Sequence, residues 1–174
     1  MARNHRPYNP AVISTLRWHA TLLPLVLLPA LAQAACKAEG PLATARWVFE
    51  RAYYFYREPA ADSADYLSAA LLPLLTREWR CKAAGRTCAF SGDPWIEAGE
   101  GSPRDPIVFS LVASPPDRRR VAVRYLFGPD GAAEPARSEL TLVLDEASQC
   151  WKVDDLAGRR DSSLRRVLQQ HTYE

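Results

Sequence analysis

The chain carries two adjacent carboxylates, Asp154 and Asp155, in the segment WKVDDL. Successive side chains of a strand point to opposite faces, so these two carboxylates cannot both serve one site. Asp155 would share the face of Trp151 and Val153, which we expect to be the buried one. A carboxylate that is removed from water becomes a stronger proton acceptor, as in enzymes that abstract protons. Asp155 is therefore the one candidate for a catalytic base, but a structural role is favoured, in which it caps the following turn or pairs with a helix arginine.

The sequence offers few histidines for catalysis or metal binding. His171 is the only histidine after residue 34, so a Ser-His-Asp or Cys-His arrangement would have to use this residue near the C-terminus. The sequence contains no H-E-x-x-H motif, no G-x-x-x-x-G-K phosphate loop and no G-x-G-x-x-G dinucleotide motif. We therefore expect no metal and no cofactor, and a binding protein is favoured over an enzyme.

The cysteines point to disulfides. Cys36, Cys81, Cys88 and Cys150 all follow residue 34, and an even number in an exported chain indicates two disulfides. Of the three possible pairings we favour Cys81–Cys88 together with Cys36–Cys150, which would tie the amino end to a late strand. A zinc site is the alternative, but the C-x-x-C spacing typical of such sites is absent.

Residues 1–34 have the organisation of a secretory signal peptide. A basic segment with three arginines and no acidic residue comes first, followed by an apolar run at 20–32 and an A-x-A cleavage pattern. The run is shorter than the roughly 20 residues that span a bilayer. We predict cleavage after Ala34, which leaves residues 35–174 as a single periplasmic or secreted domain.

The mature domain is close to neutral. The three leader arginines account for the positive formal charge, and 19 basic residues against 20 acidic ones remain. This balance argues against a nucleic-acid binder. A lipid anchor on Cys36 is the alternative location and the only expected route to a membrane. Ordinary cleavage is favoured because Gln33 stands where a lipoprotein signal has an aliphatic residue.

The sequence predicts helices in the first part of the domain and strands in the second part. Helical periodicity covers 41–57 and 62–80, and Pro73 would bend or split the second segment. Four strands joined by turn-rich segments are then expected at 107–113, 121–127, 138–145 and 150–156. A final helix is expected to start at about residue 161 or 162. This order predicts an α+β domain, with N-terminal helices packed on a curved antiparallel sheet of about four strands.

The order of these motifs also resembles a family. The exported leader, aromatic helix WVFERAYYFY, segment GDPW, strand WKVDDL and closing helix SLRRVL resemble the small exported bacterial proteins grouped as domain of unknown function 3828. More broadly, the chain is similar to the cone-shaped, cystatin-like fold of nuclear transport factor 2 and ketosteroid isomerase. The resemblance covers about residues 43–170. It implies a cavity between sheet and helix but no activity, because this fold hosts enzymes, carriers and interaction modules.

These features favour an exported, non-catalytic binding module of the bacterial periplasm or cell envelope that has a protein partner. It would act as an accessory factor or as an immunity protein that blocks a toxin. Trp95 lies in the glycine-rich segment 91–101, where we expect it to be exposed, so it is the first candidate contact residue. Tyr54 and Tyr125 are the further candidates for binding.

Other functions stay open at this point. An enzyme would use Asp155 as its base, aided by Tyr54 or Tyr125. A carrier would hold a small apolar ligand in a closed cavity of roughly several hundred Å³. The arginines at 118–120 fit either an acidic partner, anionic lipid headgroups or a solvated turn, of which the turn is favoured.

Overall fold

The computed structural model describes residues 36–173, apart from 98–100, 130–131 and 161. The signal peptide predicted for residues 1–34, with its cleavage site, lies outside the described residues. Within the described part, none of the helices combines the length and the apolar character that a membrane crossing requires.

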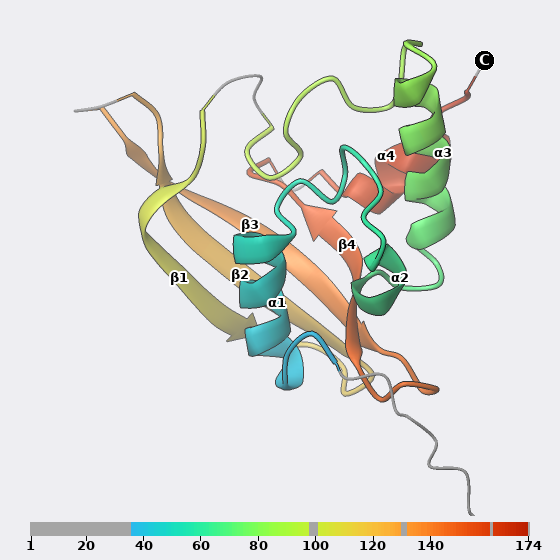
Figure 1. Ribbon diagram of the computed structural model, residues 1–174. Coiled ribbons are helices and arrows are strands. Elements are labelled where there is room, and N and C mark those ends of the chain that lie inside the picture. Colours follow the sequence, from blue (N-terminus) through green and yellow to red (C-terminus); the bar gives the residue numbers. More distant parts are fainter. Residues whose placement is uncertain (1–35, 98–100, 130–131, 161, 174) are drawn as a thin grey trace, which may run out of the picture. The chain divides into compact units, whose positions relative to one another are not determined.

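Four antiparallel strands form one curved, open sheet in the order β1-β2-β3-β4 (Figure 1). Their bounds are β1 Arg104–Val112, β2 Arg118–Phe127, β3 Glu134–Leu144 and β4 Trp151–Ala157. The prediction of an α+β domain with about four strands is confirmed. The first three strands begin earlier than the apolar runs indicate, because ladder pairing uses backbone groups and continues through polar residues.

Four helices accompany the sheet: α1 Gly40–Arg51, α2 Ser63–Tyr66, α3 Leu72–Ala83 and α4 Leu164–Gln170. The last of them confirms the predicted C-terminal helix. The segment predicted at 62–80 forms two helices rather than one bent helix. Pro73 lies in the first turn of α3, where its missing N–H removes no helical hydrogen bond.

α1 is shorter than predicted because its aromatic end is used for other contacts. The helix ends at Arg51, and the chain continues in turns. The carbonyl oxygens of Tyr53 and Phe55 accept hydrogen bonds from the indoles of Trp95 (3.0 Å) and Trp79 (3.2 Å). These long-range bonds replace the pairing that a longer helix would have supplied.

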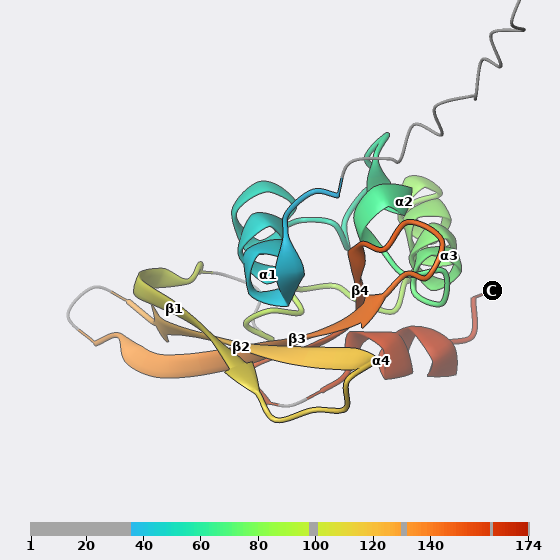
Figure 2. The same ribbon diagram turned by 90° about the horizontal axis from the view of Figure 1, so that it is seen from below.

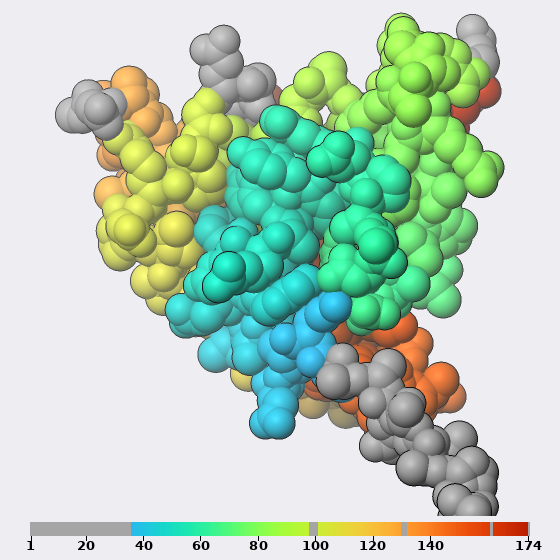
Figure 3. Space-filling view, viewed as in Figure 1, coloured from blue at the N-terminus to red at the C-terminus, as the bar shows by residue number. Residues whose placement is uncertain are grey.

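α1 and α2 pack on one face of the sheet (Figure 2). α3 packs against α4, which lies beside β4. The covered face of β2 and β3 carries buried side chains: Val121, Val123, Tyr125, Ala136, Ser138, Leu140 and Leu142. In the space-filling view α1 lies in front of the sheet, and β1 is visible beside α1 (Figure 3). The other face of β1, β2 and β3 carries no helix among the described residues.

Both predicted disulfides are present. Cys36 pairs with Cys150 and so ties the start of the domain to the start of β4, and Cys81 pairs with Cys88 after α3. Two disulfides indicate an oxidising compartment. A sulfur in a disulfide has no valence left for a lipid thioether, so the disulfide at Cys36 and the alternative of a lipid anchor there exclude each other.

Candidate functional site

Trp95 lies in the core, with 0% of its surface exposed. Its ring stacks on Tyr53 with ring centres 5.3 Å apart. Its carbonyl oxygen accepts hydrogen bonds from the hydroxyls of Tyr125 (3.0 Å) and Ser138 (2.6 Å). Asp93 accepts the Trp95 amide proton at 2.8 Å, which fixes the local turn. The expectation that Trp95 is exposed is therefore wrong, and Tyr125 belongs to the same buried cluster.

The tyrosines that follow α1 differ in exposure. Tyr54 is 52% exposed, and the Arg57 guanidinium lies 4.4 Å from its ring centre. The Tyr53 hydroxyl donates a hydrogen bond to Asp93 at 2.8 Å. Burial, reinforced by the charge of Asp93, raises the pKa of Tyr53. Tyr53 therefore keeps its proton and serves as a hydrogen-bond donor, while Tyr54 alone of the predicted contact residues reaches the surface.

A β-bulge in β4 decides where the adjacent carboxylates point. Thr141 pairs with Asp155 and Leu142 pairs with Val153, so Asp154 has no partner on β3. The bulge places Asp155 on the side of Thr141, opposite to the side of Val153. The expectation that Asp155 shares the inner face is therefore wrong, because strict alternation does not hold across the bulge.

Asp155 caps the start of α4. One carboxylate oxygen accepts the Arg165 amide proton at 2.8 Å, and the other accepts the Ser163 hydroxyl proton at 2.6 Å. This is the structural role that the sequence left open for it. The Tyr125 hydroxyl bonds to Trp95 and Ser138 instead, so Asp155 and Tyr125 do not combine into an acid–base pair.

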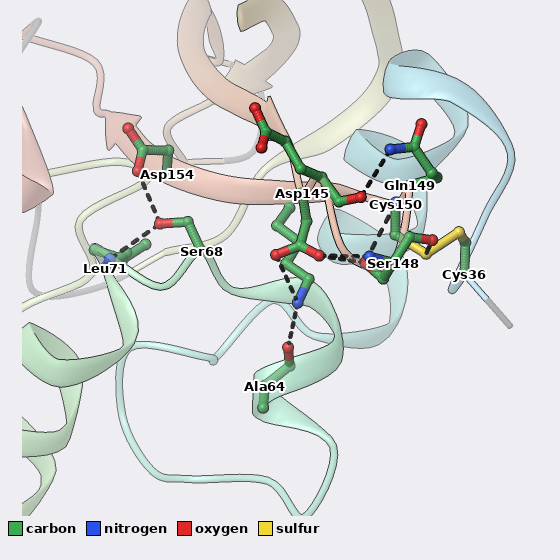
Figure 4. A network of polar contacts seen from close by, with 11 residues as sticks. Cys36, Ala64, Ser68, Leu71, Asp145, Ser148, Gln149, Cys150 and Asp154 are labelled. Carbon is green, nitrogen blue, oxygen red and sulfur yellow. Dashed lines mark hydrogen bonds and ion pairs between the residues drawn. A yellow bond between two sulfur atoms is a disulfide. The ribbon is translucent and has the colours of Figure 1, made fainter. Parts of the chain in front are cut away.

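Asp154 is the buried member of the pair. Its carboxylate accepts a hydrogen bond from the Ser68 hydroxyl at 2.8 Å (Figure 4). It also forms an ion pair with Arg165 at 2.5 Å. Arg118 approaches it at 3.6 Å. Ser68 in turn accepts the Leu71 amide proton at the start of α3. Asp154 therefore joins β4 to α3 and α4, which is a structural role rather than a catalytic one.

The uncovered face of the sheet carries exposed arginines, and this surface is the best candidate for a functional site. We call it the basic sheet face and define it by Arg118, Arg120 and Arg124 of β2 and Arg137 of β3. The strand register puts Arg124 directly opposite Arg137. Like charges in directly opposite positions destabilise a sheet, so this pair has an energetic penalty within the fold.

The basic sheet face is incompletely neutralised. A single carboxylate, Glu139, serves two of its arginines, at 3.1 Å from Arg120 and 2.6 Å from Arg137. Within the part of the chain that the structure describes, Arg124 forms no ion pair with a carboxylate. Its planar guanidinium is therefore free to bind an incoming carboxylate through two parallel hydrogen bonds.

A groove of about 550 Å³ runs across this face. Arg124, Arg137 and Arg159 supply its charge, and the last of these lies 3.8 Å from Glu134. Its apolar lining comes from Pro106, Val108, Leu126 and Pro135. Guanidinium groups beside apolar walls suit a ligand in which a carboxylate lies next to apolar side chains.

Part of this site has a signal in the sequence. The turn favoured for residues 118–120 is part of β2 in the structure. Arg118, Arg120 and Arg124 are separated by even numbers of residues, and such positions share one side of a strand. Arg137 joins them only through the register of β2 with β3, which the sequence does not specify.

Comparisons with family models, curated proteins and solved structures find no match for this chain. The resemblance to domain of unknown function 3828 and to the cone-shaped fold therefore stays a prediction. Among the described residues, no three histidine, cysteine, aspartate or glutamate side chains gather as they would around a metal ion.

Proposed function

We propose that the protein is an exported, non-catalytic binding module that engages an acidic protein partner through the basic sheet face. The observation that carries this proposal is the cross-strand pair of Arg124 and Arg137, on the side of β1, β2 and β3 that no described helix covers. Like charges directly opposite each other destabilise a sheet, and a neutral residue at either position would relieve the repulsion. Residues that serve binding are often retained at such a cost in stability. An incoming carboxylate would neutralise the pair on binding.

The electrostatics support a local rather than a general attraction. The mature chain is nearly neutral, with 19 basic and 20 acidic residues from residue 35 onward. The four arginines of the basic sheet face nevertheless lie on one side of the sheet, which gives that side a positive potential and guides an acidic partner to it. A protein of this kind would serve in the periplasm or envelope as an accessory factor or as an immunity protein.

The other two functions have less support. A carboxylate-based enzyme needs an accessible base, whereas both oxygens of Asp155 already accept hydrogen bonds at α4. A carrier needs a closed apolar cavity between sheet and helix. Trp95 fills part of that space, because it stacks on Tyr53 and contacts Phe49 edge-on with ring centres 5.2 Å apart.

The test is a comparative capture from the native envelope. Tagged wild-type protein, Arg124→Glu and Arg80→Glu are each incubated with envelope extract, and bound proteins are quantified by mass spectrometry. Arg80 is exposed on α3, so its substitution changes the net charge equally but leaves the basic sheet face intact.

We expect one acidic protein to be captured equally by the wild type and Arg80→Glu and to be lost from Arg124→Glu. Its capture should decline as salt is added, because the attraction is between exposed charges. Equal capture by all three forms would refute the basic sheet face as the binding surface.

A further inference from the structure

β1 is an edge strand with one free side. It pairs with β2 along Arg104–Val112, and no described strand lies along its other side. Alternate N–H and C=O groups of such a strand point away from the sheet and are available to another chain. In the space-filling view β1 is visible beside α1, so its free side is not covered there (Figure 3).

Only the first half of β1 has features that discourage added strands. The ladder shifts between Arg104 and Val108, and Pro106 lies within that interval. Both a bulge and a proline protect sheet edges from pairing. From Val108 to Val112 the pairing with β2 is regular, and two apolar side chains are unusually exposed there: Val108 at 48% and Leu111 at 55%.

The two sides of this edge differ in chemistry. Val108 lies opposite Arg124 on the uncovered side, at the border of the basic sheet face. Phe109 lies on the covered side, where it meets Phe49 of α1 and the Arg46 guanidinium at 4.9 Å from its ring centre. Leu111 shares that covered side because it is two residues further along the strand.

An added strand would bring its side chains within reach of the arginines. Neighbouring strands are about 4.8 Å apart, which places a fifth strand about 10 Å from β2. A glutamate reaching inward over Val108 and an arginine reaching outward from position 124 together span this distance. Apolar side chains at the alternate positions of the added strand would face the side of Leu111.

We propose that β1 binds an extended segment of the acidic partner as a fifth strand, with acidic side chains on the basic sheet face and apolar side chains beside Leu111. This inference rests on the proposed function and specifies how the partner binds. A second copy of the chain is a poorer occupant, because pairing of two β1 edges would extend one arginine-bearing face with another of the same charge.

The test uses a synthetic decapeptide of alternating glutamate and valine as the probe. A peptide of the same composition without alternation is the control, and binding is measured by fluorescence anisotropy with the intact mature protein. We expect the alternating peptide to bind at least about tenfold more tightly than the control. Arg124→Glu should weaken its binding, whereas Arg80→Glu should not.

Backbone pairing is tested on the peptide, so that the protein fold stays unchanged. In one peptide the valine amides are N-methylated, and in a second the glutamate amides are N-methylated. A fifth strand directs only one of these sets toward β1, so one peptide should lose binding and the other should keep it. Amide exchange at residues 108–112 should also slow when the unmodified peptide is bound.

The outcomes separate the two proposals. If Arg124→Glu weakens peptide binding but both methylated peptides bind alike, strand addition is wrong and the basic sheet face stands. If Arg124→Glu leaves the affinity for the alternating peptide unchanged, both strand addition and the proposed function are wrong. If light scattering shows a dimer that the peptide dissociates, β1 pairs with a second copy, and an acidic segment is not its occupant.

Discussion

Arg124 and Arg137 lie directly opposite each other on β2 and β3, on the side of β1, β2 and β3 that no described helix covers. Arg137 shares the carboxylate of Glu139 (2.6 Å) with Arg120 (3.1 Å), so the repulsion between Arg137 and Arg124 is only partly offset. The repulsion at this position opposes folding, whereas the exposed guanidinium favours an acidic partner. Arg124 therefore lowers the stability of the fold while it favours binding of an acidic partner.

The first prediction follows from this conflict. Arg124→Glu replaces a repulsive cross-strand pair with an attractive one opposite Arg137, so the variant should be more stable than the wild type by about 0.5 kcal/mol. It should also fail to bind the acidic partner. The free energy of unfolding is measured with urea, and partner binding is measured on the same preparations.

Arg120→Glu is the contrasting variant for this prediction. It places a second carboxylate beside Glu139, which already faces Arg120 at 3.1 Å, so it should lower stability. If both substitutions shift stability in the same direction, the register-based account of the repulsion is incorrect.

The second prediction separates the two adjacent carboxylates. Asp154→Ala leaves the Arg165 guanidinium without its close partner and removes a buried acceptor of Ser68, so the free energy of unfolding should decrease by about 3 kcal/mol. Asp155→Ala removes the cap of α4 and should decrease it by about 1 kcal/mol. Urea unfolding of both variants measures the difference. An enzyme that uses Asp155 as its base would instead keep its stability and lose turnover in Asp155→Asn.

The carboxylates show which features the sequence can specify. Alternation within a strand is local, and it predicts the four strands and the α+β class. The bulge at Asp154 arises from how β4 pairs with β3, and no residue type within WKVDDL marks it. A side chain beyond a bulge faces the other way, so the predicted side of Asp155 is wrong although the strand itself is found.

The exposure of Trp95 also depends on contacts that are distant in the sequence. Glycine and proline around it indicate an irregular segment, which is correct, and irregular segments are usually at the surface. Its burial depends on Tyr53, which lies 42 positions earlier and accepts the indole N–H. The disulfides are easier to predict, because four cysteines allow only three pairings, and the favoured pairing is the one observed.

The third prediction concerns Trp95 as a core residue. Trp95→Ala removes a fully buried ring from contacts with Tyr53 and Phe49, so the free energy of unfolding should decrease by about 3–5 kcal/mol. Trp95→Phe keeps most of the apolar volume and should decrease it less. Partner binding by the folded fraction of Trp95→Phe should equal that of the wild type. A selective loss of binding in this variant would restore Trp95 as a contact residue.

The fourth prediction ranks the disulfides. The Cys36–Cys150 bond joins residues 114 positions apart, whereas Cys81–Cys88 joins residues only 7 apart. By loop entropy, the first bond restricts the unfolded chain more, so its removal should decrease stability by about 5 kcal/mol and removal of the second by about 2 kcal/mol. The double variants Cys36→Ser with Cys150→Ser and Cys81→Ser with Cys88→Ser are compared by urea unfolding. Equal losses would show that the native contacts around each bond outweigh loop entropy.

The fifth prediction concerns acid stability at the turn between β3 and β4. Asp145 accepts hydrogen bonds from the Ser148 hydroxyl (2.7 Å) and the Ser148 amide (2.8 Å), and Lys152 lies 3.5 Å away (Figure 4). These donors, and then the charge of Lys152, lower the pKa of Asp145 from its ordinary value of 3.8. The carboxylate of Asp145 binds a proton more readily in the unfolded chain than in the folded protein. At pH values above the pKa of Asp145 in the unfolded chain, the ionised carboxylate therefore makes its full contribution to stability. That contribution is lost as the pH falls through the folded pKa.

Asp145→Asn tests this contribution, since asparagine does not titrate there. The variant should be less stable than the wild type at pH 7, and the difference should begin to shrink near about pH 5 and continue to shrink at lower pH. Urea unfolding of both proteins at several pH values measures that difference directly. A constant difference across this range would mean that the Ser148 hydrogen bonds stabilise the turn equally whether or not Asp145 is charged. A difference that grows as the pH falls would reverse the direction of the pKa shift and contradict the prediction.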